Sequence, residues 1–416
     1  MNGKKILQLA VMAGMMIAAA QNGMAQKVKI SGTILGSNGQ ALPNSYVNLT
    51  RPNLQHPLMS VQADENGNFT LATDAQGLIV LEFNGPNHST YTAAAVVDDT
   101  LTTSIAVRLE PRKYLTSIDS IGVIGEFNGF NYHEAVTLEK MEDGCYMADI
   151  PATSQTFSYQ LVGLVNDRSI ENPCAEKFTL APNDGFVSVA DVVDGKARVI
   201  FDPEQIASTS RKSSAVYDDP RIEQISSIYR AILDHREAYN QALTENRIAG
   251  KSLSLFSYNW TRELDGLTKM LAKEKDSVVR GMLLVSYLEL GQLGAVKQMR
   301  PVMVKWSLAT IPPVSPLWSI NPRLITLAIE KSGVEDSTYQ DYLIQAIDGQ
   351  SDPNISALLL YDGLTVAYSA KDDEKSRVYY DRLTNQFSSS RYAAMARVQF
   401  TIARADTADT QKTSLH

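Results

Sequence analysis

Hydrophobic positions follow two different periods along this chain, and the change falls near residue 219. Up to about residue 204, the pattern is one of short strands: residues 46–49 alternate apolar and polar side chains, and residues 78–83 form a short apolar run after a glycine. Dense turn residues, such as those at 64–68, separate these runs. Alternation with Gly- and Asn-rich turns is typical of antiparallel strands with one buried face. The first half therefore predicts two antiparallel β-sandwiches, over 26–112 and 113–204.

Residues 219–405 carry apolar side chains at helical spacing. Asp219 is a good helix N-cap, and Pro220 suits the first helical position after it. Prolines break the middle of the region into short helices and a loop, at positions 301, 312, 313, 316 and 322. We therefore predict an all-α domain over 219–405, preceded by a Ser-rich linker over 205–218 and followed by a flexible tail over 406–416.

The N-terminus has the pattern of a secretory signal peptide. Lys4 and Lys5 precede an apolar run over 6–20, and the small residues up to Ala25 suit a signal peptidase. The apolar run is too short to cross a bilayer comfortably. We expect cleavage after Ala25, export, and no membrane-spanning segment in the mature chain. No cysteine follows the cleavage site, so we expect no lipid anchor.

The composition limits the classes of function. The formal net charge is −8, with 44% hydrophobic and 20% charged residues, which is a globular composition. An acidic chain lacks the basic surplus that binds phosphates, so we expect no nucleic-acid partner. Cys145 and Cys174 are too few for a four-cysteine zinc site or an iron–sulfur cluster. After export they could form a disulfide worth about 3–4 kcal/mol; the alternative is two separate buried thiols.

A series of short motifs marks residues 26–112. They are Gly32-Thr-Ile-Leu, Asn38-Gly39, Leu42-Pro43, Tyr46-Val47-Asn48-Leu49 and the turn Asp64-Glu65-Asn66-Gly67-Asn68 before Phe69. Their order resembles the carboxypeptidase regulatory-like domain. The resemblance implies that Asn66-Gly67 makes the turn and that Phe69 enters the core. It also implies a non-catalytic spacer or adhesion module.

Residues 113–204 carry a Gly-x-Phe-Asn-x-aromatic core, which starts at Gly125 and ends at Phe130, and a later Tyr-x-aliphatic strand at Tyr159. This order resembles the early-set, immunoglobulin-like glycogen-binding domain. The resemblance implies a glycan site in which flat aromatic faces stack on sugar rings and polar groups fix the hydroxyls.

The sequence departs from that family at the implied sugar-binding positions. Phe130 stands where the family usually has Trp. The second stacking Trp of the family falls near Ser169, a Lys of the family falls at Gln160, and an Asn falls near Ser188. Phe130 keeps an aromatic face, and Tyr132 or Phe186 could replace the missing ring. We therefore name four glycan-site candidates: Phe130, Tyr132, Gln160 and Phe186. The alternative is that Phe127 and Phe130 serve packing alone.

The end of the helical region carries an aromatic-x-x-Leu pattern continued by Phe, Ser and Tyr-Ala, at positions 380, 383, 387, 390 and 392–393. This pattern resembles a tetratricopeptide-like helical pair. Stacked pairs of this kind present a groove, so the resemblance implies a protein partner docked by the helices. A plain helical bundle is the alternative. We expect the three tryptophans of the region in its core, at positions 260, 306 and 318.

The search for catalytic motifs gives no candidate. Neither Gly-x-Ser-x-Gly, a Gly-rich phosphate loop, His-Glu-x-x-His nor Gly-x-Gly-x-x-Gly occurs. We therefore expect no enzyme activity, catalytic residue, cofactor or metal, and we place His235 on a solvated helix face. Five Asp-Ser/Thr triplets resemble the O-glycosylation acceptor of exported Bacteroidetes proteins, although such pairs are also common at helix starts. They begin at Asp99, Asp119, Asp276, Asp336 and Asp406.

The order of all these parts resembles the front half of exported Bacteroidetes proteins of the TlpA-type thioredoxin class. The Cys-x-x-Cys thioredoxin domain that follows in those proteins is not among these 416 residues, so no reductase activity carries over. We expect an exported, non-enzymatic binding or scaffold protein of a Gram-negative cell envelope, in the periplasm or at the surface, whose helices dock a protein partner. Two alternatives are a polysaccharide-binding protein that uses the second sandwich and an accessory subunit of a separate thioredoxin-like disulfide reductase.

Overall fold

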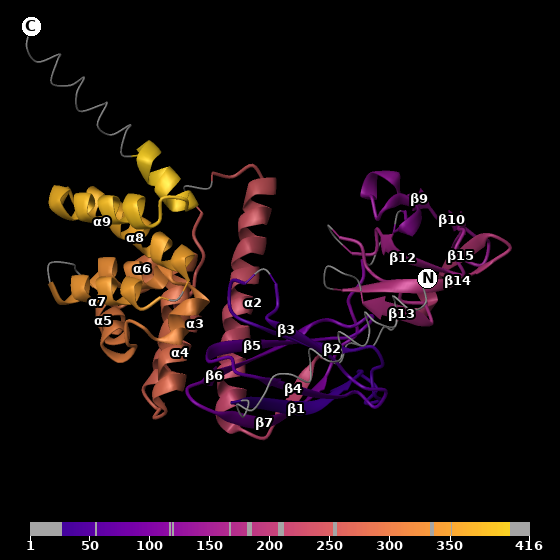
Figure 1. The fold of residues 1–416 in the computed structure, drawn as a ribbon, viewed down its shortest axis with the longest axis horizontal. Coiled ribbons are helices and arrows are strands. Elements are labelled where there is room, and N and C mark those ends of the chain that lie inside the picture. Colours follow the sequence, from indigo (N-terminus) through magenta and orange to yellow (C-terminus); the bar gives the residue numbers. More distant parts are fainter. Residues whose placement is uncertain are drawn as a thin grey trace, which may run out of the picture.

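The computed structural model describes residues 27–399, except 55, 116–117, 119, 166–167, 181–184, 207–211, 253–255, 333–336 and 351. The chain is rich in strands up to residue 217 and helical from residue 220 (Figure 1). This confirms the predicted order of β followed by α. The predicted signal peptide, 1–25, and the predicted tail, 406–416, lie outside the described residues. So do parts of the triplets at Asp119, Asp336 and Asp406.

Two four-stranded sheets with one apolar core between them form what we call the first β unit. One sheet has the order β16 (Ser214–Tyr217), β7 (Leu101–Arg108), β1 (Val28–Leu35), β4 (Asn68–Thr73). The other has the order β3 (Met59–Gln62), β2 (Tyr46–Thr50), β5 (Gly77–Asn84), β6 (Tyr91–Val97). Ile30, Leu71 and Leu81 are buried between the sheets, in agreement with the alternating pattern.

β1 and β7 pair in parallel, whereas the sequence led us to expect antiparallel strands only. Alternation reports which face of a strand is buried and says nothing about the direction of its neighbour. At Gly32 the two strands approach so closely that a Cβ atom would lie 1.9 Å from the carbonyl oxygen of Ile105. The glycine of the first quoted motif therefore permits the contact between these strands.

The chain leaves the first β unit after β7 and returns to it as β16. β16 pairs antiparallel with β7, with Ser214 opposite Arg108 and Tyr217 opposite Ile105. This strand falls within the segment predicted as a linker, 205–218, so the end of that segment is sheet. The physical reason is the open edge of β7, whose backbone groups need partners. The residues between β7 and β16 are thus an insertion between two adjacent strands.

The insertion forms a second β unit, with the strand order β10-β11-β15-β14-β12-β8-β9 and β13 also paired with β14. Its elements are β8 (Gly122–Gly125), η1 (Glu126–Asn128), η2 (Tyr132–Glu134), β9 (Val136–Thr137), β10 (Glu139–Lys140), β11 (Tyr146–Pro151), β12 (Thr156–Val162), β13 (Lys177–Leu180), β14 (Phe186–Val193) and β15 (Lys196–Phe201). Phe157, Tyr159 and Phe201 lie in its core. Asp194 and Gly195, both with positive φ, turn the chain between β14 and β15.

The helical region follows β16. Its helices are α2 (Pro220–Ile248), α3 (Thr261–Leu271), α4 (Ser277–Leu290), η5 (Gly291–Ala295), η6 (Val296–Gln298), α5 (Pro301–Thr310), η7 (Pro316–Ile320), α6 (Arg323–Ser332), α7 (Ser337–Asp348), α8 (Pro353–Ser369), α9 (Asp373–Gln386) and a last helix over 391–399. Asp219 caps α2 by accepting from the Arg221 amide at 2.8 Å, as predicted. Trp260 and Trp318 are buried, also as predicted. Among the described residues, no helix combines the length and apolarity needed to cross a membrane.

Helices cover the outer face of the β3-β2-β5-β6 sheet. Leu78 and Val80 of β5 and Ala94 of β6 belong to the apolar core that also holds the helices together. The Ser226 hydroxyl of α2 accepts from the Ala94 amide at 2.9 Å and donates to the Ala94 carbonyl at 3.0 Å. β6 is an edge strand, so this serine occupies backbone groups that would otherwise be open. The first β unit and the helical region thus form three layers: sheet, sheet and helices (Figure 1).

Candidate functional site

Three of the four glycan-site candidates are joined by one chain of hydrogen bonds on the second β unit. The Tyr132 hydroxyl of η2 lies 2.8 Å from Ser169 Oγ and accepts from the Ser169 amide at 2.7 Å. Ser169 Oγ donates to Gln160 Oε1 of β12 at 2.6 Å, and Gln160 Nε2 donates to the Phe186 carbonyl of β14 at 2.8 Å. The chain therefore fixes an exposed tyrosine and an amide from separate elements in one orientation.

Tyr132 presents the open aromatic surface of this face, with 52% of its area exposed. Phe130 is half-buried, and the described hydrogen bonds join it to the face through its backbone alone. Its φ is 60°, a left-handed conformation that costs a bulky residue energy and is uncommon for it. The amide of Phe130 donates to the Gly125 carbonyl at 3.0 Å, which holds that conformation.

Asn128 holds the loop that carries both aromatic residues. Its Oδ1 accepts from the Gly125 amide at 3.0 Å, and its Nδ2 donates to the carbonyls of Asn131 and Glu134. The asparagine of the quoted motif therefore makes three contacts across one loop. Because the loop is fixed by its own side chain, the Tyr132 ring needs little reordering on binding, which lowers the entropic cost of association.

Two of the expected sugar-binding positions are closed. Phe186 is 3% exposed, and its ring packs against Tyr46 of the first β unit with 5.4 Å between centroids. Ser188 is fully buried and accepts from the Asn172 amide at 2.7 Å. The expectation that the Phe186 ring replaces a missing stacking residue therefore needs correction, because the first β unit covers it. Its carbonyl remains part of the hydrogen-bond chain.

Phe127, for which packing alone was the alternative expectation, has mixed surroundings. Phe127 is 39% exposed. Its ring stacks on Phe157 at 6.0 Å between centroids, and Phe157 stacks on Tyr159 at 5.9 Å. A ladder of three rings thus runs from the surface into the core, a feature that spacing in sequence could not reveal.

Both cysteines are free thiols in this structure. Cys174 Sγ accepts from the Asp202 amide at 3.4 Å and donates to the Asp202 carbonyl at 3.5 Å. Burial raises the pKa of the Cys174 thiol, which disfavours the thiolate. The Cys145–Cys174 disulfide stays a prediction.

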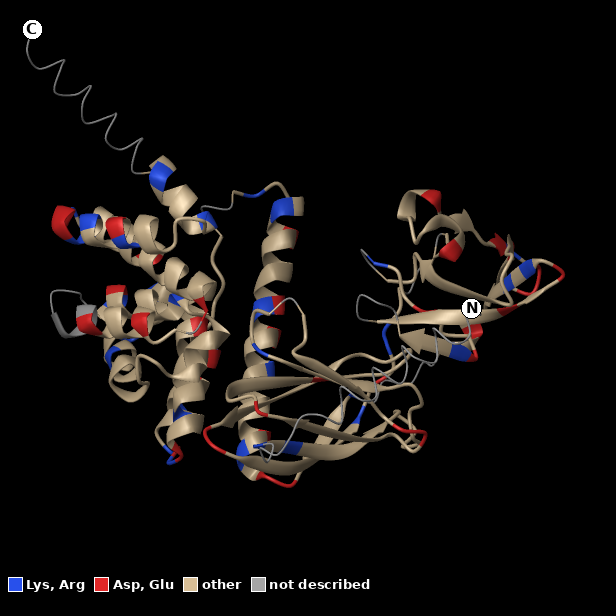
Figure 2. Ribbon diagram, in the orientation of Figure 1, with Lys and Arg blue, Asp and Glu red and all other residues tan. Residues whose placement is uncertain are grey.

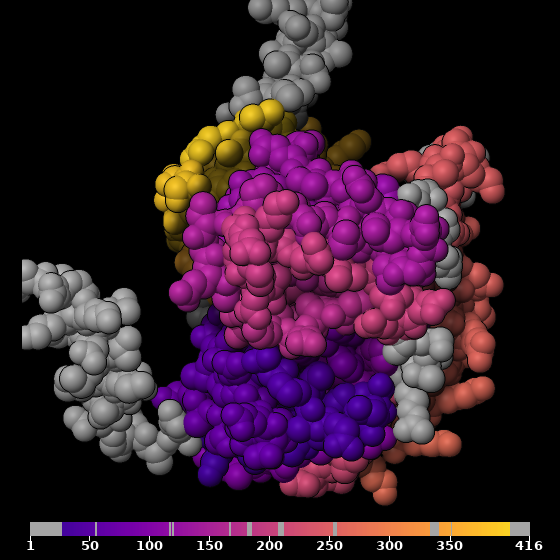
Figure 3. All heavy atoms as spheres, turned by 90° about the vertical axis from the view of Figure 1, so that its right-hand side faces the viewer, coloured from indigo at the N-terminus to yellow at the C-terminus, as the bar shows by residue number. Residues whose placement is uncertain are grey.

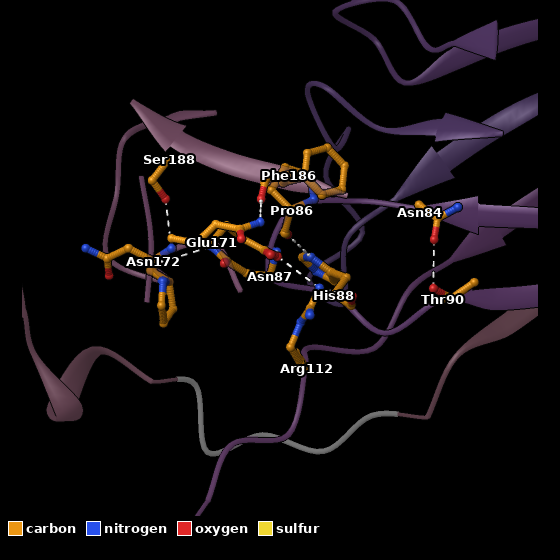
Figure 4. A network of polar contacts seen from close by, with 12 residues as sticks. Asn84, Pro86, Asn87, His88, Thr90, Arg112, Glu171, Asn172, Phe186 and Ser188 are labelled. Carbon is orange, nitrogen blue, oxygen red and sulfur yellow. Dashed lines mark hydrogen bonds and ion pairs between the residues drawn. The ribbon is translucent and has the colours of Figure 1, made fainter. Parts of the chain in front are cut away.

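A buried ion pair joins the second β unit to the first (Figure 4). Arg112, just after the first unit, donates to Glu171 Oε1 at 3.0 Å, and the Asn87 amide donates to the same oxygen at 2.7 Å. Asn87 Nδ2 also donates to the Pro173 carbonyl at 3.2 Å. Glu171 is 2% exposed, so its charge depends on these partners. We call Asn87, Arg112 and Glu171 the junction clamp; Figure 3 shows the two units in direct contact.

The helical region is tied to the first β unit by a second set of polar contacts. Asn53, in the β2–β3 loop, donates to the carbonyls of Ser319 and Ile320 in η7 at 2.7 and 3.2 Å. Within the helical region, Arg236 of α2 holds the same η7 segment: it donates to the Ile320 carbonyl at 3.2 Å and to buried Glu289 of α4 at 2.6 Å. Charges of both signs are interspersed over the helices (Figure 2), so this region offers no large surface of one sign.

His235 and Asp276, two further side chains considered for chemistry, both make structural contacts. Within the described part of the chain, no group of three His, Cys, Asp or Glu side chains could hold a metal ion. His235 is half-buried and meets Trp260 edge-on at 5.1 Å, which corrects its placement on a solvated face. Asp276, from one of the Asp-Ser triplets, caps α4 by accepting from the amides of Val278 and Val279.

No family model matches this sequence, and no curated protein matches it. Solved structures give partial likenesses. A putative carbohydrate-binding protein from Bacteroides uniformis is 10% identical, over 48% of this chain and 93% of that one, with a TM-score of 0.18. A TPR-domain-containing protein from Parabacteroides distasonis is 11% identical, over 88% and 73%, with a TM-score of 0.21. A 3-chlorocatechol 1,2-dioxygenase from Rhodococcus opacus is 11% identical, over 21% and 60%, with a TM-score of 0.16. The chain spans less than two thirds of that dioxygenase, and at these TM-scores neither fold nor activity carries over.

Proposed function

We propose that this chain is an exported, non-enzymatic binding protein of the cell envelope and that its second β unit binds carbohydrate. The observation that carries the proposal is the chain of hydrogen bonds from Tyr132 through Ser169 to Gln160. It gives an exposed aromatic ring beside a fixed amide, the combination that stacks on a pyranose ring and orients its hydroxyls. We also propose that the two β units are the two sandwiches that the sequence resembles and that the helices are tetratricopeptide-like.

The arrangement of the helices supports a ligand on the second β unit. The helical region buries apolar side chains against β5 and β6 of the first β unit. That surface is therefore occupied by the chain itself. The face around Tyr132 belongs to the other β unit, and the junction clamp holds it in a fixed position relative to the first.

The test is mobility in native gels that contain soluble polysaccharides of different linkage. We expect the mature chain to be retarded by at least one glycan. Phe130→Ala and Tyr132→Ala should lose that retardation, because both remove aromatic surface. Tyr368→Ala is the matched control, since Tyr368 is 45% exposed on α8, in the helical region. Unchanged mobility of the wild type in every glycan, or equal retardation of all variants, would refute the proposal.

A second candidate is a protein partner at the far end of the helical region. Three apolar side chains there are exposed: Val378 of α9 at 55%, and Met395 and Val398 of the last helix at 47% and 62%. Large exposed apolar side chains that lie together favour an interface, and we propose that these three form such a surface. We expect Val378→Glu combined with Val398→Lys to lose a stoichiometric partner that copurifies from native envelope. Val302→Glu, at a 67% exposed position of α5, is the control that should keep it.

A further inference from the structure

A hollow of about 250 Å³ lies where the first and second β units meet. The β1–β2 turn and the β5–β6 turn of the first unit form one side. The connector after β7 and two segments of the second unit form the other, including the end of η3 (Pro203–Gln205). The residues that line it are Gly36, Ser37, Asn38, Gln40, Ala41, Leu42, Asn87, His88, Pro111, Tyr114, Pro173, Gln205 and Ile206. None of them belongs to the Tyr132 face.

Hydrogen bonds within the protein orient three lining side chains. His88 Nδ1 lies 2.7 Å from the Pro86 carbonyl and must donate to it (Figure 4). Asn87 Nδ2 donates to the Pro173 carbonyl, and Gln205 Nε2 donates to Asp202 Oδ2 at 3.0 Å. Each partner can only accept, so the orientation of all three side chains is fixed. His88 Nε2 remains as an acceptor. The Gln205 amide keeps Oε1 as an acceptor and the second N–H of Nε2 as a donor.

The hollow is uncharged. No Lys, Arg, Asp or Glu is among its described lining residues. Burial lowers the pKa of His88, so its imidazole is neutral at neutral pH and Nε2 carries a lone pair. A charged ligand would find no counter-charge among these lining residues. The chemistry therefore favours a neutral molecule that both donates and accepts hydrogen bonds.

The rest of the lining fits a small ring. Leu42, Pro111, Pro173 and Ile206 supply apolar surface for C–H groups. The volume lies below the about 300–1,000 Å³ of pockets for drug-sized ligands, which suits one ring rather than a chain of rings.

We propose that this hollow, which we call the junction pocket, binds a neutral polyhydroxylated ring the size of one monosaccharide. The ligand hydroxyls donate to His88 Nε2 and Gln205 Oε1 and accept from Gln205 Nε2. Gly36 keeps room for them, because a methyl group at this position would lie 3.4 Å from His88 Nε2 and 3.3 Å from Asn38 Oδ1. The junction pocket is separate from the Tyr132 face and does not depend on it.

The test is saturation-transfer NMR of the mature chain with D-glucose, D-galactose, D-mannose and N-acetylglucosamine, each alone. Gluconate and glucosamine serve as the anionic and cationic comparisons. We expect transfer to at least one neutral sugar and at least tenfold weaker binding of the charged analogues. Transfer to none of the four sugars, so that water alone occupies the pocket, overturns the proposal. Equal binding of gluconate or glucosamine overturns the assignment to neutral ligands.

Variants separate this pocket from the Tyr132 face. Gln205→Leu removes a ligand contact and Gly36→Ala narrows the space before His88. We expect each to weaken the sugar about five- to tenfold, which is the loss of one hydrogen bond. Tyr132→Ala is the control and should leave this affinity unchanged. If Tyr132→Ala weakens the sugar while Gln205→Leu and Gly36→Ala do not, the ligand lies on the other face and the junction pocket is refuted. That result would leave the proposed carbohydrate function standing.

Discussion

The ion pair of Glu171 and Arg112 is more deeply buried than an ion pair that joins two β strands of the second β unit. Their side chains are 3% and 15% exposed, whereas Arg198 and Asp149, paired across β15 and β11, are 62% and 30% exposed. A buried pair gives little net stability when intact, but removal of one partner leaves an uncompensated charge in a poorly solvated site. Loss of one partner of the junction clamp should therefore change the free energy of unfolding more than the intact pair contributes to it.

We expect Arg112→Ala to lower the free energy of unfolding by about 3–5 kcal/mol, since Glu171 would stay buried without its cation. Urea unfolding followed by circular dichroism measures the change. Arg198→Ala removes an exposed pair and should cost about 0–1 kcal/mol. Equal losses for the two variants would show that Glu171 reaches solvent or another cation.

Asp362 of α8 should make stability depend on pH. Burial raises its pKa to about 6, although Arg323 at 3.5 Å acts in the opposite direction. The folded chain then holds this proton more tightly than the unfolded chain, so stability falls as pH rises from about 4 to about 6. Asp362→Asn should remove that loss and raise the free energy of unfolding at pH 8 by up to about 3 kcal/mol, with little effect at pH 4. Denaturation curves at both pH values test this; a variant that is less stable at pH 8 contradicts it.

Helix starts and strand edges show which features a sequence can reveal. Asp219 and Pro220 predicted where the first helix begins, because a helix cap is a contact between residues that are close in the sequence. β16 was missed, since four residues, two of them half-buried, give too short an alternation. The covering of β6 by Ser226 was missed as well, because the two partners lie 132 residues apart. The same limit applies to the candidate face, where Tyr132 and Gln160 could be named but the covering of Phe186 by Tyr46 could not.

At the element scale, Ser226→Ala tests the contact between α2 and β6. It would leave the buried amide and carbonyl of Ala94 without this partner, and we expect a loss of about 1–3 kcal/mol in the free energy of unfolding. Ser227→Ala is the matched control, because Ser227 is exposed on the same helix. A loss below 0.5 kcal/mol for Ser226→Ala would mean that β6 tolerates an open edge here.

At the scale of the whole molecule, the apolar core of the helices extends onto Leu78, Val80 and Ala94 of the first β unit. The core between the sheets of that unit includes Ile222 of α2, whereas the second β unit has a core of its own. We expect scanning calorimetry to show the first β unit and the helical region unfolding in a single transition. Arg112→Ala should then separate the second β unit as an earlier transition, since the junction clamp no longer couples it to the first. Two transitions that divide the first β unit from the helices would contradict the shared core.

The return of the chain as β16 has a mechanical consequence. Two strands that pair with each other, β7 and β16, connect the second β unit to the first. Ser214 lies opposite Arg108 at the point of attachment. If the chain is pulled from its ends, tension passes from the first β unit to α2 through the β7–β16 ladder and the α2–β6 packing. The second β unit lies outside this load path, so it stays relaxed until the ladder tears. A protein built in this way can carry strain between its ends while its candidate binding face keeps its shape.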